Sequence, residues 1–479
     1  MNWSSRFFSL FFNSGVSAAA SLFILMACSR LLGVEDYGIY RKFFLSVELV
    51  VPVVGMGLAQ SVFRFFPDYN KERMLKLCIL LVLSFSATFC MLLSFPRHSL
   101  IFGLIEGRLH GLEFFYFLGV LHAVGLPIIT SFFVDSKKLK AFTRVNVLFS
   151  IITAFSISVL CYFTRDFRLL VEVKVVLGVA FLLLGLLYYM SSCRGDFDFS
   201  RPELSALDLL KFSLPVAMAS AVGIISQSID KLFVAYFESS EAYAVYVNGA
   251  TEVPLISLVT GALATSAVGY MSSKCAQGDY ASALNSFRGI AEKSCLVLMP
   301  IFVFFLINAK GFLILLFGDD YLESWKPFCI YLLLLPIRVV FYGPALIALG
   351  KSKVIFYRGV VELFFNFLLS AVLYFYVGSI GLAIATVFVV YAWSVPYNLI
   401  NIKEGFGVPL RSVLPFKSIA FVLMMSLILS PAAYFPGKAF EFDYKEQFAI
   451  NFLSYFSAVI AVYLARGIIS ISSLKRIRF

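Results

Sequence analysis

The sequence predicts an all-α polytopic membrane protein with two six-helix halves and a C-terminal helix pair. Three observations predict it: the composition, the spacing of apolar stretches, and an internal repeat. The 479 residues are 61% hydrophobic and only 14% charged, and their mean hydropathy is +0.91. Water-soluble globular domains do not reach these values. The chain is therefore expected to lie in a lipid bilayer.

Apolar windows long enough to cross a membrane recur along the whole chain. A transmembrane helix needs about 20 predominantly apolar residues. About fourteen such windows lie near residues 9–32, 39–63, 75–95, 114–134, 143–163, 171–192, 209–237, 242–270, 290–317, 325–349, 354–377, 378–400, 414–435 and 447–466. Only "VGSIG" separates the windows at 354–377 and 378–400, so counts of twelve or thirteen spans stay open.

The distribution of basic residues predicts the orientation. Cytoplasmic loops of membrane proteins carry an excess of Lys and Arg. With the N-terminus inside, most of the 39 basic residues fall on the cytoplasmic side, among them Arg73, Lys76, Lys138, Lys140 and Lys475. Both termini are therefore expected in the cytoplasm. The net charge of +11 is explained by anionic lipid headgroups and requires no nucleic acid.

No sequence feature indicates a catalytic, metal or cofactor site. The eight cysteines form no close pairs, and His98, His110 and His122 are each twelve residues apart. These spacings suit neither a disulfide framework nor a metal site. There is no Gly-rich phosphate loop, paired-carboxylate motif or nucleophile elbow. We therefore expect no cofactor, no metal and no catalytic residue.

An internal repeat divides the chain into halves. A shift of 206 residues superimposes Tyr37 on Tyr243, Tyr40 on Tyr246, Gly55 on Gly261 and Ser14 on Ser220. The repeat predicts an N-terminal lobe at 1–205, a C-terminal lobe at 206–403, and additional helices with a basic tail at 404–479. Because the first span pairs with the seventh, the halves should be related by an axis along the membrane normal.

Four short motifs carry a family resemblance. Arg30 is followed by "LLG", an acid and "YG". The later motifs are "LPVAMASAVGIISQSIDKLFVAYF" with Asp230 near its end, "FGDDYLESWKPF" (Phe317 to Phe328) and "GSIGLAIAT" (Gly378 to Thr386). In this order they resemble the polysaccharide transporter branch of the multidrug/oligosaccharidyl-lipid/polysaccharide exporter (MOP) superfamily, which contains the Wzx-type O-antigen flippases.

The resemblance implies two lobes around a central cavity that opens alternately to each side of a bacterial cytoplasmic (inner) membrane. The implied substrate is a polyprenyl-diphosphate-linked oligosaccharide, which moves from the cytoplasmic to the periplasmic leaflet for O-antigen, lipopolysaccharide or other surface polysaccharide synthesis. The implied partners are membrane lipid, a polysaccharide polymerase and other assembly proteins.

Charged residues inside spans are the candidates for substrate contact. A charge at mid-membrane costs about 2.5–3.5 kcal/mol, so it usually faces a cavity or a partner. Arg338 is the clearest candidate to hold the diphosphate, and Tyr331 and Tyr342 flank it. The other candidate cations, nearer to span ends, are Arg30, Arg64 and Arg358.

Acidic residues within spans are candidates for ion coupling or interhelical pairing. They are Glu48, Asp230, Glu252 and Glu362, together with Lys231 beside Asp230. Glu48 shares a helix face with Arg41 and Pro52, and Glu362 shares one with Arg358 and Asn366. For Asp230 and Lys231, which lie near an external helix end, interhelical pairing is the preferred interpretation.

Three alternative functions stay open beside the flippase. A cation-coupled small-molecule (drug) antiporter of the same superfamily would also have two six-helix halves. A lipid II flippase of the same superfamily also stays open, because one sequence does not separate the two branches. A membrane glycan polymerase or ligase, the enzymatic alternative, is disfavoured because the loops are short.

Overall fold

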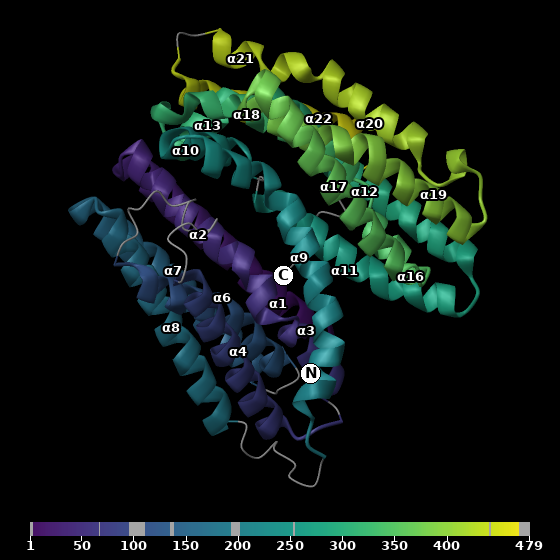
Figure 1. Ribbon diagram of the computed structural model, residues 1–479. Coiled ribbons are helices and arrows are strands. Elements are labelled where there is room, and N and C mark those ends of the chain that lie inside the picture. Colours follow the sequence, from purple (N-terminus) through teal and green to yellow (C-terminus); the bar gives the residue numbers. More distant parts are fainter. Residues whose placement is uncertain are drawn as a thin grey trace. The chain divides into compact units, whose positions relative to one another are not determined.

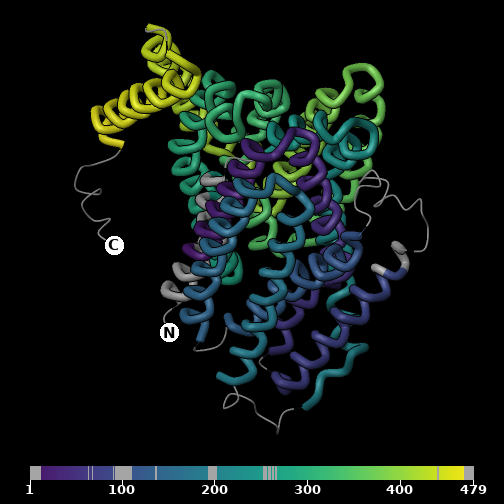
Figure 2. Tube along the Cα trace, turned by 90° about the vertical axis from the view of Figure 1, so that its left-hand side faces the viewer, coloured from purple at the N-terminus to yellow at the C-terminus, as the bar shows by residue number. Residues whose placement is uncertain are grey.

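The computed structural model describes residues 3–66, 68–94, 111–134, 138–192, 202–251, 254–439 and 442–468 (Figure 1). Within these ranges the secondary structure is helical, with no strand, which confirms the predicted all-α class. The chain forms two compact units, residues 1–244 and 245–479. Figure 2 gives a second view, in which the last helices, drawn in yellow, gather at one edge of the second unit.

The first unit is a bundle of long helices. They are α1 (Trp3–Leu31), α2 (Val34–Gly55), α3 (Leu58–Phe65), α4 (Lys71–Ser94), α6 (Glu113–Val134), α7 (Leu139–Thr164), α8 (Phe167–Ser192) and α9 (Ala206–Phe237). Helix α6 packs against α2, α4 and α8, whereas α9 packs against α2 and α3. The apolar core therefore surrounds α2 and α6.

The window predicted at 39–63 is broken rather than continuous. Met56 and Gly57 both have left-handed backbones, with φ of 43° and 64°, and they separate α2 from α3. A Cβ atom at Gly57 would lie 2.7 Å from the carbonyl oxygen of Ser213 on α9. Glycine is required here both for the positive φ and for the close approach of α9.

Helices α1 and α7 lie side by side, parallel and in register. Asn13 bonds to Asn146 and Ser17 to Ser150, so both pairs are 133 residues apart. Parallel neighbours in a bilayer must be separated by an odd number of crossings. Helix α6 crosses the membrane once between α1 and α7. For the number of crossings between them to be odd, the α2–α3 segment and α4 must either both cross the membrane or both not cross it.

The second unit contains shorter and more frequently broken helices. They are α10 (Ser240–Gly249), which begins at the end of the first unit, α11 (Pro254–Ala276), α12 (Tyr280–Ile307), α13 (Ala309–Phe317), α14 (Trp325–Leu332), α15 (Leu335–Arg338), α16 (Tyr342–Ala348), α17 (Ser352–Val377), α18 (Ser379–Val389), α19 (Val395–Phe406), α20 (Phe416–Ile428), α21 (Phe435–Lys438) and α22 (Tyr444–Ala465). A π-helical turn, Val390–Ser394, joins α18 to α19.

Among the described residues, nine helices are long and apolar enough to span a membrane. The segments Asp319–Leu332 and Leu335–Ala348 are bent by 44° relative to each other at a short break. If they are counted as one broken span, there are ten. The windows at 39–63, 75–95, 242–270 and 414–435 are helical but are not among these ten. The chain is thus a multi-pass membrane protein, and the count of fourteen stays a prediction.

The helix ends reproduce the sequence repeat. Helix α1 ends at Leu31 and α9 at Phe237, and α2 begins at Val34 and α10 at Ser240. Both separations are 206 residues, the shift found in the sequence. The lobe boundaries at 205/206 and 403/404 stay predictions, because α9 packs on helices of the first unit.

Candidate functional site

Three cations lie among tyrosines where α2 meets α8 in the first unit. The Nη1 of Arg41 donates to the hydroxyl of Tyr37 over 2.8 Å. The Nζ of Lys42, a residue only 2% exposed, lies 5.8 Å from the ring centroid of Tyr243. The Nζ of Lys174 on α8 donates to the hydroxyl of Tyr40 over 3.1 Å. We call Arg41, Lys42 and Lys174 the cation cluster.

The contacts of these cations with aromatic side chains are favourable. The Nζ of Lys174 also lies 3.8 Å from the ring centroid of Phe44, within the range of a cation–π interaction. Phenol oxygens and ring faces attract a cation but carry no net charge at neutral pH. These aromatic contacts therefore add no negative charge to the cluster.

Two predicted acids border the cation cluster. The carboxylates of Asp230 on α9 and Glu48 on α2 both lie within electrostatic range of Tyr243. Asp230 is buried, at 2% exposure, whereas Glu48 is exposed. Lys231, next to Asp230, is half-buried and donates to the carbonyl oxygen of Gln227.

The remaining predicted residues of the first unit lie on its exterior. Arg30 is exposed at the end of α1. Arg64 is exposed on α3 and pairs with Asp68 one helical turn away, at 3.4 Å. Such an exposed pair contributes little to stability, about 0–1 kcal/mol.

In the second unit, Arg338 lies in the broken span formed by α14, α15 and α16. It is half-buried at the end of the four-residue helix α15. Tyr331 on α14 shares a 3.0 Å hydrogen bond with the hydroxyl of Tyr246, and Tyr342 begins α16. Glu252 lies outside the described residues.

A polar stripe on α17 faces the π-helical turn. The Nε of Arg358 lies 3.7 Å from Oε2 of Glu362, which also accepts a 2.5 Å hydrogen bond from Ser394. Further along α17, the side-chain oxygen of the buried Asn366 accepts from Ser370 and Thr386. The stripe therefore binds α17 to the connection between α18 and α19.

The π-helical turn also contacts the broken span. Tyr391 donates its hydroxyl to the carbonyl oxygen of Leu333, at the break between α14 and α15, over 2.6 Å. Trp393 stacks on Tyr397, with ring centroids 4.9 Å apart. Single π turns inside α-helices occur frequently at functional sites.

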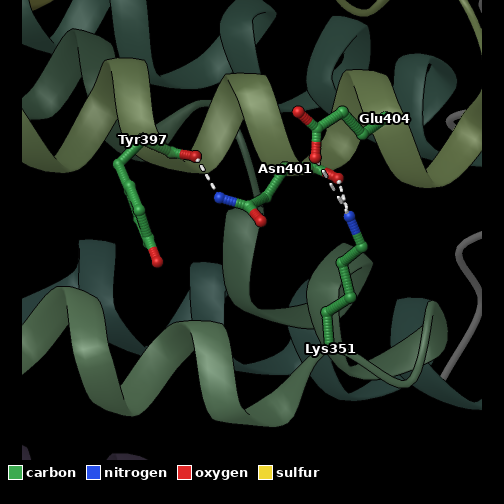
Figure 3. Close-up of polar contacts among 4 residues, drawn as sticks. All are labelled: Lys351, Tyr397, Asn401 and Glu404. Atoms are coloured by element: carbon green, nitrogen blue, oxygen red, sulfur yellow. Dashed lines mark hydrogen bonds and ion pairs between the residues drawn. The ribbon is translucent and has the colours of Figure 1, made fainter.

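One end of the second unit is fixed by Lys351, at the turn from α16 to α17 (Figure 3). Its Nζ donates to the carbonyl oxygen of Asn401 over 2.9 Å and lies 3.7 Å from a carboxylate oxygen of Glu404. The Asn401 amide in turn donates to the carbonyl oxygen of Tyr397. These contacts anchor the α16–α17 turn to α19.

Sequence reasoning named Arg41 only as a neighbour of Glu48 and did not identify Lys174. Lys174 occurs in "VEVKVV", where a basic residue follows the start of an apolar window and resembles an ordinary headgroup anchor. The sequence feature that could have indicated a partly buried lysine is the valine on each side of Lys174. The structure separates Arg41 and Lys174, which are half-buried, from Arg30 and Arg64, which are exposed.

Comparison with protein families identifies the chain. Residues 27–326 match the model of a family described as polysaccharide biosynthesis protein. The chain belongs to that polysaccharide biosynthesis protein family. No curated protein matches the sequence.

The fold of this polysaccharide biosynthesis protein is that of MOP-superfamily transporters. It is similar to the lipid II flippase MurJ in an inward closed conformation, with a TM-score of 0.68, 16% identity, and 95% of this chain and 98% of MurJ covered. The chain is also similar to an inward-facing multidrug resistance MATE transporter, with a TM-score of 0.58 and 14% identity. This match covers 86% of this chain and 96% of the transporter. A third similar structure is a MOP-superfamily transporter from Pyrococcus furiosus, whose binding pocket has reverse polarity. The TM-score is 0.53 and the identity 13%, and the match covers 87% of this chain and 96% of that transporter.

Proposed function

We propose that this protein is a flippase that moves a polyprenyl-diphosphate-linked oligosaccharide from the cytoplasmic to the periplasmic leaflet of a bacterial inner membrane. It would act by alternating access and supply O-antigen or other surface polysaccharide synthesis. The family match to polysaccharide biosynthesis proteins and the MOP transporter fold support this proposal. Neither relationship requires an enzymatic step.

The observation that carries the proposal is the cation cluster. A diphosphate that leaves the aqueous interface needs compensating positive charge, and the hydrogen bonds between cations and phosphate oxygens are strong. Arg41 keeps its charge in any environment. Arg41, Lys42 and Lys174 provide three positive charges in contact with tyrosine side chains. In the second unit Arg338 and Arg358 are the corresponding candidates.

The test replaces Lys174 while retaining its volume. Lys174→Met should lower surface glycan at least about tenfold, because it removes a charge-assisted hydrogen bond to the anion. The lipid-linked oligosaccharide should then accumulate on the cytoplasmic leaflet. Lys174→Arg should retain partial activity. The matched control is Lys310→Met, because Lys310 also contacts an aromatic ring, that of Trp325, at 5.0 Å.

Normal transport by Lys174→Met would reject a role of Lys174 in holding the diphosphate. Accumulation of unpolymerised units on the outer leaflet would reject flipping itself and favour a role in polymerisation. The similarity to MurJ favours a second candidate function, a lipid II flippase. Accumulation of lipid II in cells depleted of this protein would support that function.

A small-molecule antiporter is less compatible with the cation cluster. Cationic drugs would be repelled by Arg41, Lys42 and Lys174, although Glu48 and Asp230 lie nearby. Export of cationic dyes by the purified protein in liposomes, with no movement of lipid-linked oligosaccharide, would establish this alternative.

A further inference from the structure

A shallow, open pocket of about 390 Å³, with a lining about equally polar and apolar, lies on the α11–α12 hairpin of the second unit. Its lining consists of Tyr270 from α11 and of Ser282, Asn285 and Ser286 from α12. The three α12 residues are spaced by three and four positions, so they share one helix face. The volume lies at the lower end of the range for small-ligand sites, about 300–1,000 Å³.

The lining is uncharged and rich in hydrogen-bonding groups. Asn285 offers both amide donors and an acceptor, and each serine offers a hydroxyl. Within the part of the chain that the structure describes, the side chains of Tyr270, Asn285 and Ser286 form no hydrogen bond with the protein. The Tyr270 ring is 51% exposed and provides a flat apolar surface beside these groups.

The opposite face of α12 holds the pocket in place. Ala283, Leu284 and Phe287 are buried in a core with Met271 of α11 and Ile402 of α19. The same end of the unit is anchored by Lys351 (Figure 3). The backbone of the pocket is therefore supported by packed helices on its inner side.

The turn between α11 and α12 is also well fixed. Asp279 caps α12 by accepting a 3.0 Å hydrogen bond from the amide of Ser282, and it lies 3.4 Å from Nζ of Lys274. The hydrogen bonds from Ser282, followed by Lys274, lower the pKa of the Asp279 carboxyl. Gly278 closes the turn with φ of +76°. Neither charged residue lines the pocket.

We propose that this pocket binds a sugar residue of the lipid-linked oligosaccharide beyond the first, which is attached to the diphosphate. The C–H face of the sugar ring would pack on Tyr270, and its hydroxyls would bond to Asn285 and Ser286. A diphosphate would need positive charge, which this lining lacks, whereas a neutral polyhydroxylated ring needs only hydrogen-bonding groups. The inference rests on the proposed function and concerns the glycan, not the diphosphate.

The position of the pocket suits a glycan. Tyr270 and Ser286 each lie eight residues from Gly278, which corresponds to about 12 Å along a helix. The predicted orientation places this turn in the cytoplasm, so the pocket would lie near headgroup depth on the cytoplasmic side. A sugar could bind there while the rest of the oligosaccharide remains hydrated.

The experiment measures flipping in proteoliposomes with two probes. One is a polyprenyl diphosphate carrying a tetrasaccharide, and the other is the same lipid carrying a single sugar. Tyr270→Ala should lower the flipping rate of the tetrasaccharide lipid about tenfold. It should lower the flipping rate of the single-sugar lipid less. Tyr270→Trp should retain activity, because it keeps an aromatic face. Tyr280→Ala is the matched control: Tyr280 is 47% exposed at the start of α12 and does not line the pocket.

The outcomes separate the two proposals. If the wild-type protein moves neither lipid, the proposed function fails. If it moves both and Tyr270→Ala behaves like Tyr280→Ala, the sugar site is rejected and the flippase stands. Equal slowing of both lipids by Tyr270→Ala would assign Tyr270 to packing and reject the sugar site. A loss that disappears when the phosphatidylglycerol of the proteoliposomes is replaced by phosphatidylcholine would assign the pocket to a lipid headgroup and also reject the sugar site.

Discussion

The side-chain amide of Asn146 on α7 donates a 3.0 Å hydrogen bond to the side-chain oxygen of Asn13 on α1. Ser17 and Ser150 repeat this contact one turn later, at 2.9 Å. Polar pairs of this kind hydrogen-bond transmembrane helices to each other, in addition to their van der Waals packing. The two pairs together fix the direction and the register of α1 against α7.

Replacing one asparagine of this pair should destabilise the first unit. Asn146→Leu leaves the Asn13 amide unpaired at the helix interface, and we expect a loss of about 0.6–1.7 kcal/mol. The measurement is thermal unfolding in detergent. Asn13→Leu/Asn146→Leu should recover most of the loss. A double variant whose loss equals the sum of the two single losses would show that the pair contributes no coupling.

Gly38 on α2 should not tolerate a side chain. A Cβ atom at Gly38 would collide with the backbone carbonyl of Ser240. Gly38→Val should therefore sharply reduce the amount of folded protein, measured by size-exclusion chromatography in detergent. Gly33→Val is the matched control, since Gly33 has open space around it and φ of −63°. Similar yields of the two variants would contradict the close approach.

An asparagine pair attaches the C-terminal helices to the second unit. Asn451 on α22 donates to the side-chain oxygen of Asn308 over 2.8 Å, and accepts from the amide of Gly437 over 2.8 Å. Asn308 also donates to the carbonyl oxygen of Ala433. Both asparagines are buried.

Asn451→Leu should therefore leave two buried polar groups unsatisfied, each at a cost of about 1–3 kcal/mol. We expect a lower unfolding temperature and faster proteolysis between α21 and α22. Leu453→Ala, at an exposed position of the same helix, should change neither quantity. An unchanged proteolysis pattern for Asn451→Leu would mean that the asparagine pair does not hold these helices.

The Arg358–Glu362 pair allows a structural role to be separated from substrate binding. Arg358→Ala leaves a carboxylate of 20% exposure with Ser394 as its hydrogen-bond donor, so abundance and transport should both fall. Arg358→Ala/Glu362→Gln should restore abundance. If Arg358 also binds the diphosphate, this double variant should remain inactive. Full recovery of transport would leave Arg358 with only its structural role.

Cysteine labelling should determine the orientation. Ser352 is exposed at the start of α17, and the Asp319 side chain is 76% exposed. In a cysteine-free background, Ser352→Cys should react with an impermeant maleimide only from the cytoplasm, and Asp319→Cys only from outside. Labelling from the opposite side at either position would overturn the predicted topology.

Composition and apolar windows were sufficient to predict the helical membrane class, because the bilayer imposes helix length and apolarity directly on the sequence. The repeat was also visible, and the helix ends at Leu31, Val34, Phe237 and Ser240 reproduce it. The breaks were not predicted. Met56 is a non-glycine residue in a left-handed conformation, and the π turn at Val390–Ser394 differs from an α-helix only in its hydrogen bonding. Neither changes the hydropathy.

The charged candidates were predicted less well than the fold. Hydropathy indicates that Arg338 or Glu362 lies within a span, but does not indicate which side chains meet. Glu362 and Arg358, four residues apart on one helix, could be predicted to interact. Lys174 meets Tyr40 across 134 residues of sequence, and only the packing of α2 against α8 brings the two together.

The equal spacing of the helix ends has a consequence for the history of the chain. In each half, two residues connect the first helix to the second, Leu32–Gly33 and Glu238–Ser239. A chain that arose by duplication of one ancestral segment would have kept this connection at constant length. One inserted residue would rotate the following helix by about 100° and turn Tyr40 away from Lys174 on α8. We therefore expect natural insertions and deletions among relatives to avoid these two corners.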